Sequence, residues 1–123
     1  MEHKDALTWF EIPAADLARA TRFYETVLAG KLKSEAMGPR RMSIFPYTEP
    51  GVGGALMEGK GPSQSANATL VYLWVARLDE ALERVGKAGG TIALPRTPLP
   101  EGMGHFAHII DSEGNRVGLH SLH

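Results

Sequence analysis

The sequence predicts an α+β domain that contains the same half-domain twice. Shifting the chain against itself by 61 residues, so that Phe10 meets Val71, aligns two segments with the same apolar pattern. The matched positions are Phe10, Glu11, Ile12, Leu17, Ala20 and Tyr24 in the first half and Val71, Tyr72, Leu73, Leu78, Ala81 and Val85 in the second. Each half has the pattern of an apolar strand, a short turn and an amphipathic helix, with short strands after it. We therefore expect a two-copy architecture with a ligand cleft between the copies.

The first half is expected over residues 6–58. Residues 7–12 predict a strand, because they are rich in β-formers and too few for a helix. Apolar residues at helical spacing from Leu17 to Leu28 predict a helix that Asp16 caps and Gly30 closes. Shorter strands are predicted at residues 31–36, 41–45 and 53–58.

The second half repeats this order over residues 69–121, after a connector at residues 59–68 that contains Gly-Lys-Gly-Pro-Ser-Gln-Ser. Its predicted elements are a strand at 70–75, a helix at 78–88 and strands at 91–94, 105–110 and 116–120. The proline-rich residues 95–103 predict an exposed loop, and residues 111–115 predict a turn because Asp, Gly and Asn favour turn geometry.

Composition limits the compartment and the partners. At 123 residues the chain predicts one domain, residues 1–123, whose halves share a core. Thirteen basic and fourteen acidic residues without a block of like charge predict no nucleic-acid or membrane partner, so a small molecule is the expected ligand. The chain has no cysteine, which excludes disulfides and thiolate chemistry. Since neither a leader-like segment nor a membrane-spanning apolar run is present, we expect a cytoplasmic protein.

Strand alternation predicts which side chains face the helices and which face a ligand. Phe10 and Ile12 should lie beneath the first helix, because a helix needs apolar neighbours. The opposite faces then carry Trp9, Glu11 and Pro13 in the first strand, Leu70, Tyr72 and Trp74 in the first strand of the second half, and Arg116, Gly118 and His120 in the last. Trp9, Tyr72 and Trp74 are candidate contacts for a planar or apolar ligand, or core residues. Met57 is a further candidate contact, although buried methionines commonly fill gaps.

Glu11 and His120 are the candidate catalytic groups. A carboxylate among apolar neighbours is costly to bury without a partner, so Glu11 is either a metal ligand or general base, or a carboxylate paired with a basic or hydroxyl side chain. His120 has the parity of the same predicted face and can be a metal ligand or an acid–base group. A histidine so close to the end of the sequence can also be exposed and inert.

Several short motifs, taken in order, resemble a known family over nearly the whole chain. They are Phe10-Glu11-Ile12-Pro13, Asp16-Leu17 with Ala20 and Phe23-Tyr24, Gly53-Gly54-Ala55-Leu56, Gly89-Gly90, and residues 111–120. Together they resemble the glyoxalase/bleomycin-resistance/dioxygenase superfamily, also called vicinal oxygen chelate proteins. The resemblance implies two βαβββ modules that form a cup-shaped mixed sheet with the helices on the outside, and it implies a homodimer.

The resemblance also implies where a metal ligand set would lie, and three of those positions lack a ligand here. The first-strand ligand of metal-dependent relatives falls seven residues before the aspartate of the Asp-Leu motif, which is Trp9 in this sequence. Its counterpart in the second module is Leu70, and the last-strand glutamate corresponds to Gly118. Glu11 and His120 lie two residues further along these strands, so a shifted site is geometrically possible.

A shifted site needs a third ligand, because a catalytic divalent ion typically has three protein ligands and an open position. The remaining candidates are Glu58, His105 and His108. His105 and His108 have opposite strand parity, so at most one of them can face the ligand.

Two functions of different class follow. The first is a glyoxalase-like enzyme, a divalent-metal-dependent lyase or a dioxygenase relative, that acts on a small oxygenated metabolite or thiol adduct with Glu11, His120 and one Zn, Ni, Mn or Fe ion. The second is a non-catalytic drug- or antibiotic-binding protein of the bleomycin-resistance type, in which Trp9, Tyr72 and Trp74 stack on the ligand. The empty ligand positions favour the second function, and the matching positions of Glu11 and His120 favour the first. A third possibility is a module that binds no ligand.

Overall fold

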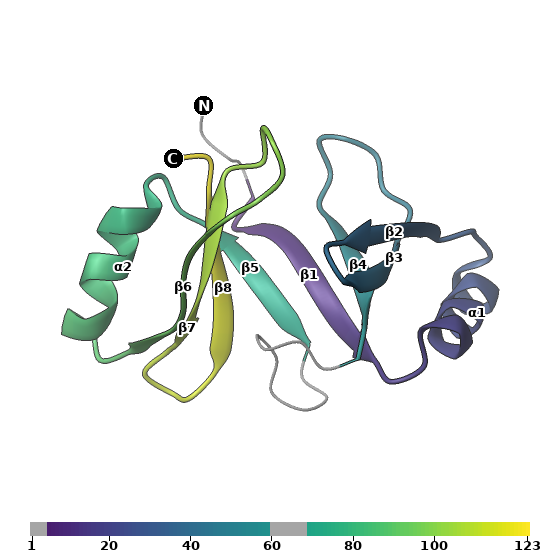
Figure 1. The fold of residues 1–123 in the computed structure, drawn as a ribbon, viewed down its shortest axis with the longest axis horizontal. Coiled ribbons are helices and arrows are strands. Elements are labelled where there is room, and N and C mark those ends of the chain that lie inside the picture. Colours follow the sequence, from purple (N-terminus) through teal and green to yellow (C-terminus); the bar gives the residue numbers. More distant parts are fainter. Residues whose placement is uncertain (1–4, 60–68) are drawn as a thin grey trace. The chain divides into compact units, whose positions relative to one another are not determined.

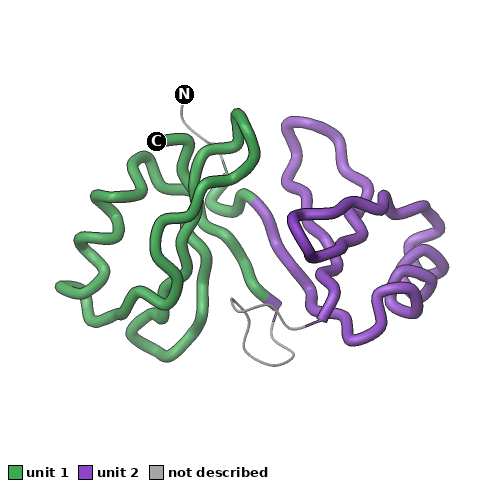
Figure 2. The backbone as a smooth tube through the Cα atoms, in the orientation of Figure 1, with its two compact units in different colours: residues 1–8, 70–123 green, residues 9–69 purple. Residues whose placement is uncertain are grey.

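The computed structural model describes residues 5–59 and 69–123, which divide into two compact units. Unit 1 comprises residues 1–8 and 70–123, and unit 2 comprises residues 9–69 (Figure 2). The predicted connector at residues 59–68 lies outside the described residues except for Gly59. Within the described ranges, neither helix is long and apolar enough to cross a membrane.

The described residues of unit 2 form one helix and four strands, which Figure 1 labels. Its elements are β1 (Leu7–Ala14), whose first two residues belong to unit 1, α1 (Leu17–Leu28), β2 (Lys33–Met37), β3 (Arg40–Ile44) and β4 (Gly53–Glu58). The strands lie in the order β2-β3-β4-β1. Strands β1 and β4 are parallel, whereas β2 with β3 and β3 with β4 are antiparallel.

Unit 1 repeats this arrangement. Its elements are β5 (Leu70–Trp74), α2 (Leu78–Lys87), β6 (Thr91–Pro98), β7 (His105–Ile110) and β8 (Arg116–Ser121). The strands lie in the order β5-β8-β7-β6, with β5 and β8 parallel and the other pairs antiparallel. Because strand, helix and three strands recur with the same pairing, the predicted α+β fold of two βαβββ modules is confirmed.

One predicted loop is wrong in its first four residues, 95–98, whereas residues 99–103 do lie between strands. Residues 95–103 were expected to be an exposed loop, but β6 continues to Pro98 and pairs with β7 as far as His105. The register of β6 with β7 shifts between Ile92 and Leu94 and again between Leu94 and Thr97, and Pro95 lies within the second of these intervals. A proline is tolerated at such an irregularity and on the last strand of a pairing order, where no further ladder needs its missing N–H. The prolines therefore interrupt the register without ending the strand.

The ends of α1 show how local hydrogen bonds set the element boundaries. Asp16 caps the helix as predicted, because its carboxylate accepts the Arg19 N–H at 3.0 Å. This hydrogen bond holds the pKa of Asp16 below its usual value. The predicted stop at Gly30 is displaced by one residue, since Ala29 takes the left-handed conformation with φ of 54°. The Gly30 N–H then bonds to the Glu25 carbonyl at 3.2 Å.

Each unit has its own apolar core between its helix and its strands. In unit 2, buried Leu17 and Leu56 pack with partly buried Ile12. In unit 1, Leu78 of α2 packs against Leu119 of β8. These contacts confirm the predicted parity, because Ile12 and Leu119 face the helices and their strand neighbours therefore face away.

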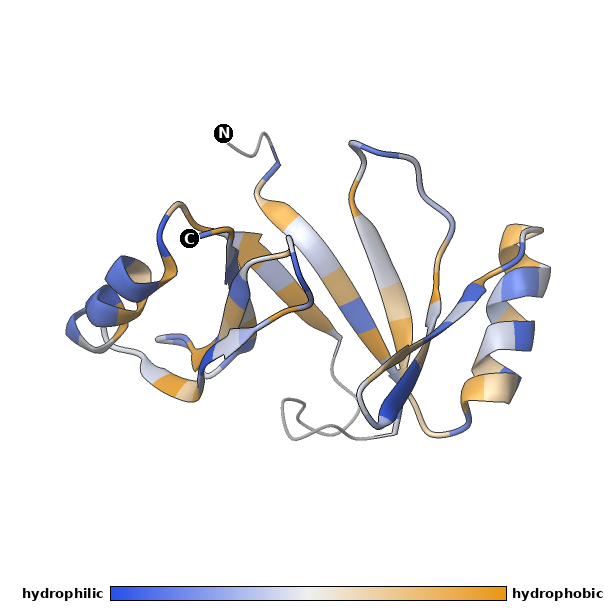
Figure 3. Ribbon diagram, turned by 45° about the horizontal axis from the view of Figure 1, so that its top comes forward, coloured by the Kyte–Doolittle hydropathy of each residue, from blue (hydrophilic) through white to orange (hydrophobic). Residues whose placement is uncertain are grey.

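The two helices differ in the surface that they present. Figure 3 shows α2 as mostly hydrophilic, whereas α1 is a mixture of apolar and polar segments. On α1, Phe23, Val27 and Leu28 are all more than half exposed. The apolar residues of α1 thus extend beyond the stripe that packs on β1 and β4.

Residues at and just after the end of β8 form hydrogen bonds with the backbone at the beginning of α2. Helix α2 has no side-chain cap at Arg77, and its Leu78 N–H instead donates to the backbone oxygen of His123 at 3.1 Å. Ser121 fixes this chain end, since its buried hydroxyl lies 2.9 Å from the carbonyls of Ala76 and His123 and accepts the His123 N–H. The hydroxyl thereby joins β8 to the segment between β5 and α2.

We expect Ser121→Ala to reduce the free energy of unfolding by roughly 0.5–1.5 kcal/mol, because it removes a buried hydroxyl that bonds to the backbone of Ala76 and His123. Ser112→Ala is the matched control, since the Ser112 hydroxyl is exposed and bonds only to the neighbouring Glu113 side chain. Chemical denaturation of the two variants measures the difference. Equal stabilities for both variants would show that the Ser121 hydroxyl does not hold the start of α2.

Candidate functional site

One face of the strands in unit 1 gathers the polar and aromatic side chains. Leu119 and Ala107 pack against α2, so the alternate residues of β7 and β8 point to the other side. Strand pairing sets Tyr72 beside Gly118, and it sets His120 between Trp74 and Phe106. We call this side, with Tyr72, Trp74, Phe106, His108, Arg116 and His120, the polar face of unit 1.

A hydrogen-bonded chain of three side chains runs across the polar face. The Tyr72 hydroxyl lies 2.8 Å from Nε2 of His108, and the Arg116 Nε–H donates to Nδ1 of His108 at 3.4 Å. His108 is fully buried, and Tyr72 is only 7% exposed. The rings of Tyr72, His108 and Phe106 also contact one another, with centroids 5.4 to 5.9 Å apart. Burial strengthens these hydrogen bonds, because little water competes for them.

The direction of hydrogen donation in this chain follows from Arg116. A guanidinium can only donate, so Nδ1 of His108 is the acceptor and the proton of the neutral imidazole is on Nε2. That Nε2–H donates to the Tyr72 oxygen. Hydrogen donation therefore runs from the Arg116 guanidinium to His108, and from His108 to the Tyr72 oxygen.

Gly118 makes room for Tyr72. A Cβ atom at position 118 would overlap the Tyr72 ring, so no side chain fits there unless the ring moves. The resemblance to metal-dependent relatives places a ligating glutamate at this position. The packing of Tyr72 thus excludes that ligand on steric grounds, in addition to its absence from the sequence.

His120 has one satisfied and one unsatisfied nitrogen. Its Nε2 lies 2.7 Å from the carbonyl oxygen of Met103, which can only accept, so Nε2 carries the proton. Nδ1 is buried and has no hydrogen-bond partner among the described residues. Met103 belongs to the turn between β6 and β7, where the Leu99 N–H bonds to the Gly104 carbonyl at 2.9 Å. This turn orients the imidazole.

In unit 2 the structure brings Glu11 and Trp9 together on the side opposite α1. Glu11 is 6% exposed, and its carboxylate accepts the Trp9 indole N–H at 3.3 Å. Pairing of β1 with β4 places Glu11 beside Ala55 and Pro13 beside Met57. Trp9 packs with the apolar cluster of Met42 and Met57, so the indole whose N–H the Glu11 carboxylate accepts borders methionine side chains.

The other candidate ligands have different surroundings. Glu58 forms an ion pair with Arg41 at 2.8 Å, and this hydrogen-bonded partner lowers the pKa of Glu58. His105 is in an exposed contact with Arg96 at 3.3 Å, and His108 belongs to the buried chain with Tyr72. Within residues 5–59 and 69–123, no group of three or more His, Asp or Glu is arranged to hold a metal ion.

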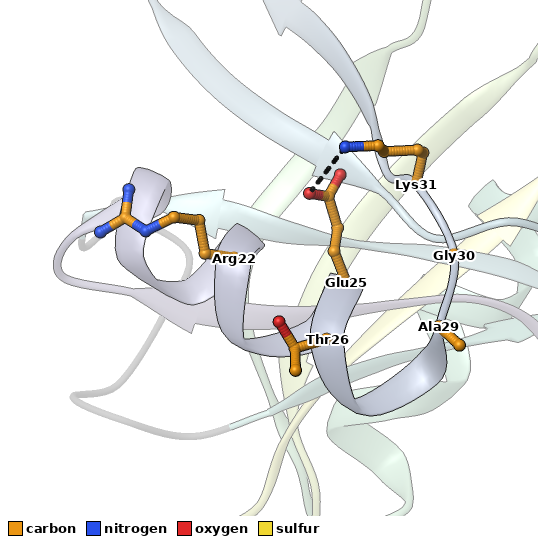
Figure 4. A pocket seen from close by; sticks show the side chains of 6 residues that line it. All are labelled: Arg22, Glu25, Thr26, Ala29, Gly30 and Lys31. Carbon is orange, nitrogen blue, oxygen red and sulfur yellow. Dashed lines mark ion pairs between the residues drawn. The ribbon is translucent and has the colours of Figure 1, made fainter.

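A surface pocket at the end of α1 is lined by none of the predicted site residues (Figure 4). Within it the Lys31 ammonium lies 4.0 Å from the Glu25 carboxylate, which also accepts the Leu32 N–H at 2.9 Å. Its lining consists of Arg22, Glu25, Thr26, Ala29, Gly30 and Lys31. Since Lys31 is almost fully exposed, its ion pair with Glu25 is a weak surface interaction.

The fold and the sequence together define the family. The model of the Glyoxalase/Bleomycin resistance protein/Dioxygenase superfamily matches residues 6–119, and the chain belongs to this superfamily. Comparison with curated proteins gives no significant match.

Solved structures share this fold at low sequence identity. Methylmalonyl-CoA epimerase from Mycobacterium tuberculosis is 17% identical, with a TM-score of 0.68 over 98% of this chain and 92% of that chain. A variant of the epimerase from Streptomyces coelicolor, in complex with 2-nitronate-propionyl-CoA, is 16% identical with a TM-score of 0.63 over 94% and 96%. An NAD-dependent benzaldehyde dehydrogenase from Legionella pneumophila is 16% identical with a TM-score of 0.58 over 94% and 98%. At these identities the similarity concerns the fold alone.

The sequence did not reveal the chain of hydrogen bonds from Arg116 through His108 to Tyr72. Alternation along β8 placed Arg116 and His120 on the face opposite α2, but Tyr72 was interpreted as a ligand contact or a core residue and not as a hydrogen-bonding partner of His108. Tyr72 and His108 are 36 residues apart, and both contact positions depend on the register of β5, β8 and β7. The role of the Met103 carbonyl had no signal in the sequence, because any residue supplies a carbonyl.

We expect Gly118→Ala to lower the free energy of unfolding by roughly 1–3 kcal/mol, because the new methyl group displaces the Tyr72 ring from a packed position. Gly86→Ala in α2 is the control, since a Cβ there meets no atom within 4 Å and the change favours the helix by up to about 1 kcal/mol. Denaturation curves should therefore shift in opposite directions. A neutral Gly118→Ala variant would contradict the close packing of Tyr72 on β8.

The ion pair of Glu58 and Arg41 should make stability depend on pH. The folded-state pKa of Glu58 is lowered, so the pair stabilises the fold above the ordinary value of 4.5, and this stabilisation is lost as the pH falls through the lowered pKa. Glu58→Gln should be less stable than the wild type near neutral pH and should approach it in acid. Arg41→Gln is expected to show the same pH dependence. A stability difference that does not change with pH would rule out this linkage.

Proposed function

We propose that the chain is a glyoxalase-like enzyme that acts on a small oxygenated metabolite or a thiol adduct. Membership of the superfamily supports a small-molecule ligand, and His120 is the observation that favours chemistry over simple binding. In this proposal His120 and Glu11 are the acid–base groups or metal ligands, each in its own unit.

His120 supports this function because of its unsatisfied nitrogen. Leaving a buried lone pair without a partner is unfavourable, so Nδ1 is suited to accept a proton or bind an ion. The opposite nitrogen donates to the Met103 carbonyl, which fixes the ring and its tautomer. Histidines that bind metals are oriented in the same way, through a second-nitrogen hydrogen bond to a carbonyl or carboxylate.

The proposal includes one divalent ion, Zn, Ni, Mn or Fe, with His120 and Glu11 as candidate ligands. The positions implied by family resemblance do not fit an ion, because Trp9, Leu70 and Gly118 offer no ligating side chain. His120 does fit, through Nδ1, and the carboxylate of Glu11 supplies oxygen donors that the Trp9 N–H orients. When bound, such an ion would hold neighbouring substrate oxygens and stabilise negative charge on them.

A second candidate function is sequestration of an aromatic or basic compound. Trp9 packs with the methionine cluster and donates its indole N–H to the buried Glu11 carboxylate, and such an aromatic and apolar surface suits a ligand with a positive charge on an apolar frame. Trp9, Met57, Tyr72 and Trp74 are the proposed ligand contacts in this function. The absence of ligating residues at the family positions Trp9, Leu70 and Gly118 favours it.

The proposal treats residues 1–123 as one domain of a cytoplasmic homodimer. A second chain would cover open strand edges, which otherwise invite pairing with other molecules. Light scattering on the purified protein measures the mass in solution, and a monomeric mass would contradict the dimer.

Metal content and turnover test the enzymatic function. The tag-free protein, exposed to Zn²⁺, Ni²⁺, Mn²⁺ or Fe²⁺ and then dialysed, should retain near-stoichiometric metal in mass spectrometry. Glu11→Gln and His120→Ala should each bind the ion at least about tenfold more weakly and lose turnover of a hemithioacetal or a catechol. His105→Ala is the matched histidine control and should retain the ion, because Nδ1 of His105 contacts Arg96 instead.

Equal metal content in the wild type and His120→Ala would contradict the proposed role of His120. Absence of bound metal and of turnover in the wild type would contradict the enzymatic function. A thermal-shift screen with aromatic amines, in which Trp74→Ala weakens binding more than His120→Ala, would then support sequestration.

A further inference from the structure

Strand β2 has one open edge in the described part of the chain. It ends the strand order of unit 2, and its pairing partner there is β3. Strand β6 ends the order of unit 1 in the same way, but it contains Pro95 and Pro98, and its register with β7 shifts twice. Proline has no N–H and is a common means of blocking an edge strand. Strand β2 (Lys33–Met37) contains no proline, so it is the edge that can accept another strand.

The backbone groups of Ser34 and Ala36 point away from β3. The Phe45 N–H, just beyond β3, donates to the Gly54 carbonyl at 2.9 Å. Because hydrogen bonding alternates along an antiparallel strand, the odd-numbered residues of β3 bond to β4 and the even-numbered ones bond to β2. The even-numbered residues of β3 pair with three residues of β2, namely Lys33, Glu35 and Met37. The N–H and C=O of Ser34 and Ala36 are therefore directed at the open edge.

We propose that β2 pairs antiparallel with β2 of a second copy of this chain, about a twofold axis at Ser34. In this arrangement the two Ser34 residues face each other, and each Lys33 faces the partner's Glu35. The same surface is used on both chains, as in other twofold dimers. The inference rests on the homodimer of the function proposed above and names its surface, but it requires neither the metal ion nor the chemistry.

Charge selects this register over its neighbours. Lys33 and Glu35 are alternate residues of β2, so their side chains lie on one face, where they form an ion pair at 3.0 Å. With the axis at Ser34, two further pairs of opposite charge form between the chains. An axis one residue away, at Lys33 or at Glu35, would instead set two like charges directly opposite each other, which is unfavourable.

The backbone supports the same register. With Ser34 on the axis, its outward N–H and C=O meet the C=O and N–H of the partner's Ser34, as in a hydrogen-bonded pair of an antiparallel ladder. Ser34 and Ala36 are exposed, and the Lys33 side chain is 75% exposed. A lysine on an edge discourages pairing with an apolar strand, whereas the partner's Glu35 compensates its charge. The edge thus favours its own copy over other strands.

The interface is small, so the dimer should be weak. Strand β2 has five residues, whereas stable interfaces bury about 1,200–2,000 Å² in total. We therefore expect a monomer–dimer equilibrium that shifts with protein concentration. Salt should weaken the dimer, because the ion pairs between the chains are close to solvent.

Sedimentation velocity of the full chain over a range of concentrations, at low and at high salt, tests the side-chain pairing. Lys33→Glu should weaken the dimer at least about tenfold, because both ion pairs between the chains become repulsive. The double variant Lys33→Glu/Glu35→Lys should restore it, since opposite charges face each other again. Lys87→Glu is the matched control, because it changes the net charge equally at an exposed residue of α2 in unit 1.

Two substitutions of Ser34 test the backbone pairing. Ser34→Pro removes an N–H that points away from β3, so it should weaken the dimer at least about tenfold and leave the hairpin of β2 and β3 intact. Ser34→Ala keeps the N–H and should dimerise as the wild type does. In the wild type, hydrogen exchange of the Ser34 amide should slow as the protein concentration rises. Thermal denaturation of each variant separates loss of the dimer from loss of the fold.

The proposal is overturned by a wild type that stays monomeric at the highest concentration reached, by an unchanged dimer in Lys33→Glu or Ser34→Pro, or by a double variant that does not restore the dimer. The failures are distinguishable. A monomeric wild type also contradicts the proposed homodimer, whereas a dimer that none of these variants weakens contradicts the β2 interface alone. Metal content and turnover decide the enzymatic function independently of both.

Discussion

The packing of the Tyr72 ring over Gly118 is the contact on which the rest of the polar face depends. It places the phenol where its oxygen meets His108, and it occupies the space that any side chain at position 118 would need. His108 in turn contacts Arg116 two residues before Gly118 on the same strand, so β8 supplies both the gap and the charge. Because residue 118 is a glycine, the Tyr72 ring occupies the space next to it where the resemblance implies a metal-ligating side chain.

The same superfamily fold can carry different side chains at the positions of its metal ligands. The βαβββ module supplies parallel first and last strands, here β5 and β8, and their facing residues are where chemistry can be placed. In this chain the first strands carry Trp9 and Leu70 at the positions that resemblance associates with metal ligands, while Glu11 and His120 lie two residues further along. The same backbone can therefore support a displaced ion, a hydrogen-bonded chain of side chains or a stacking surface, and the side chains decide among them.

Much of the fold could be predicted from the sequence because the signals are local. The cap at Asp16, the apolar spacing of both helices and the turn at Asp111 each act within a few residues, and the structure contains all three. The extension of β6 through Pro98 was missed because a proline-rich segment resembles a loop until its pairing with β7 is known.

The candidate site was only partly predictable, for a related reason. Alternation is a local property, and it assigned Arg116, Tyr72 and His120 to the face opposite α2. The bond between Tyr72 and His108 depends instead on the register of three strands, and the bond between His120 and Met103 depends on the course of a turn. Neither is encoded in a spacing that the sequence alone displays.

The most direct measurement is the protonation pattern of His108 and His120 by NMR on protein labelled with nitrogen-15 in histidine, in mildly alkaline buffer. Substitution of each histidine assigns its signals. Both rings should carry their proton on Nε2, with His108 accepting at Nδ1 and His120 bonded to the Met103 carbonyl. A proton on Nδ1 of His108 would contradict the direction of donation from Arg116 to Tyr72, and a proton on Nδ1 of His120 would remove the lone pair on which its proposed role rests.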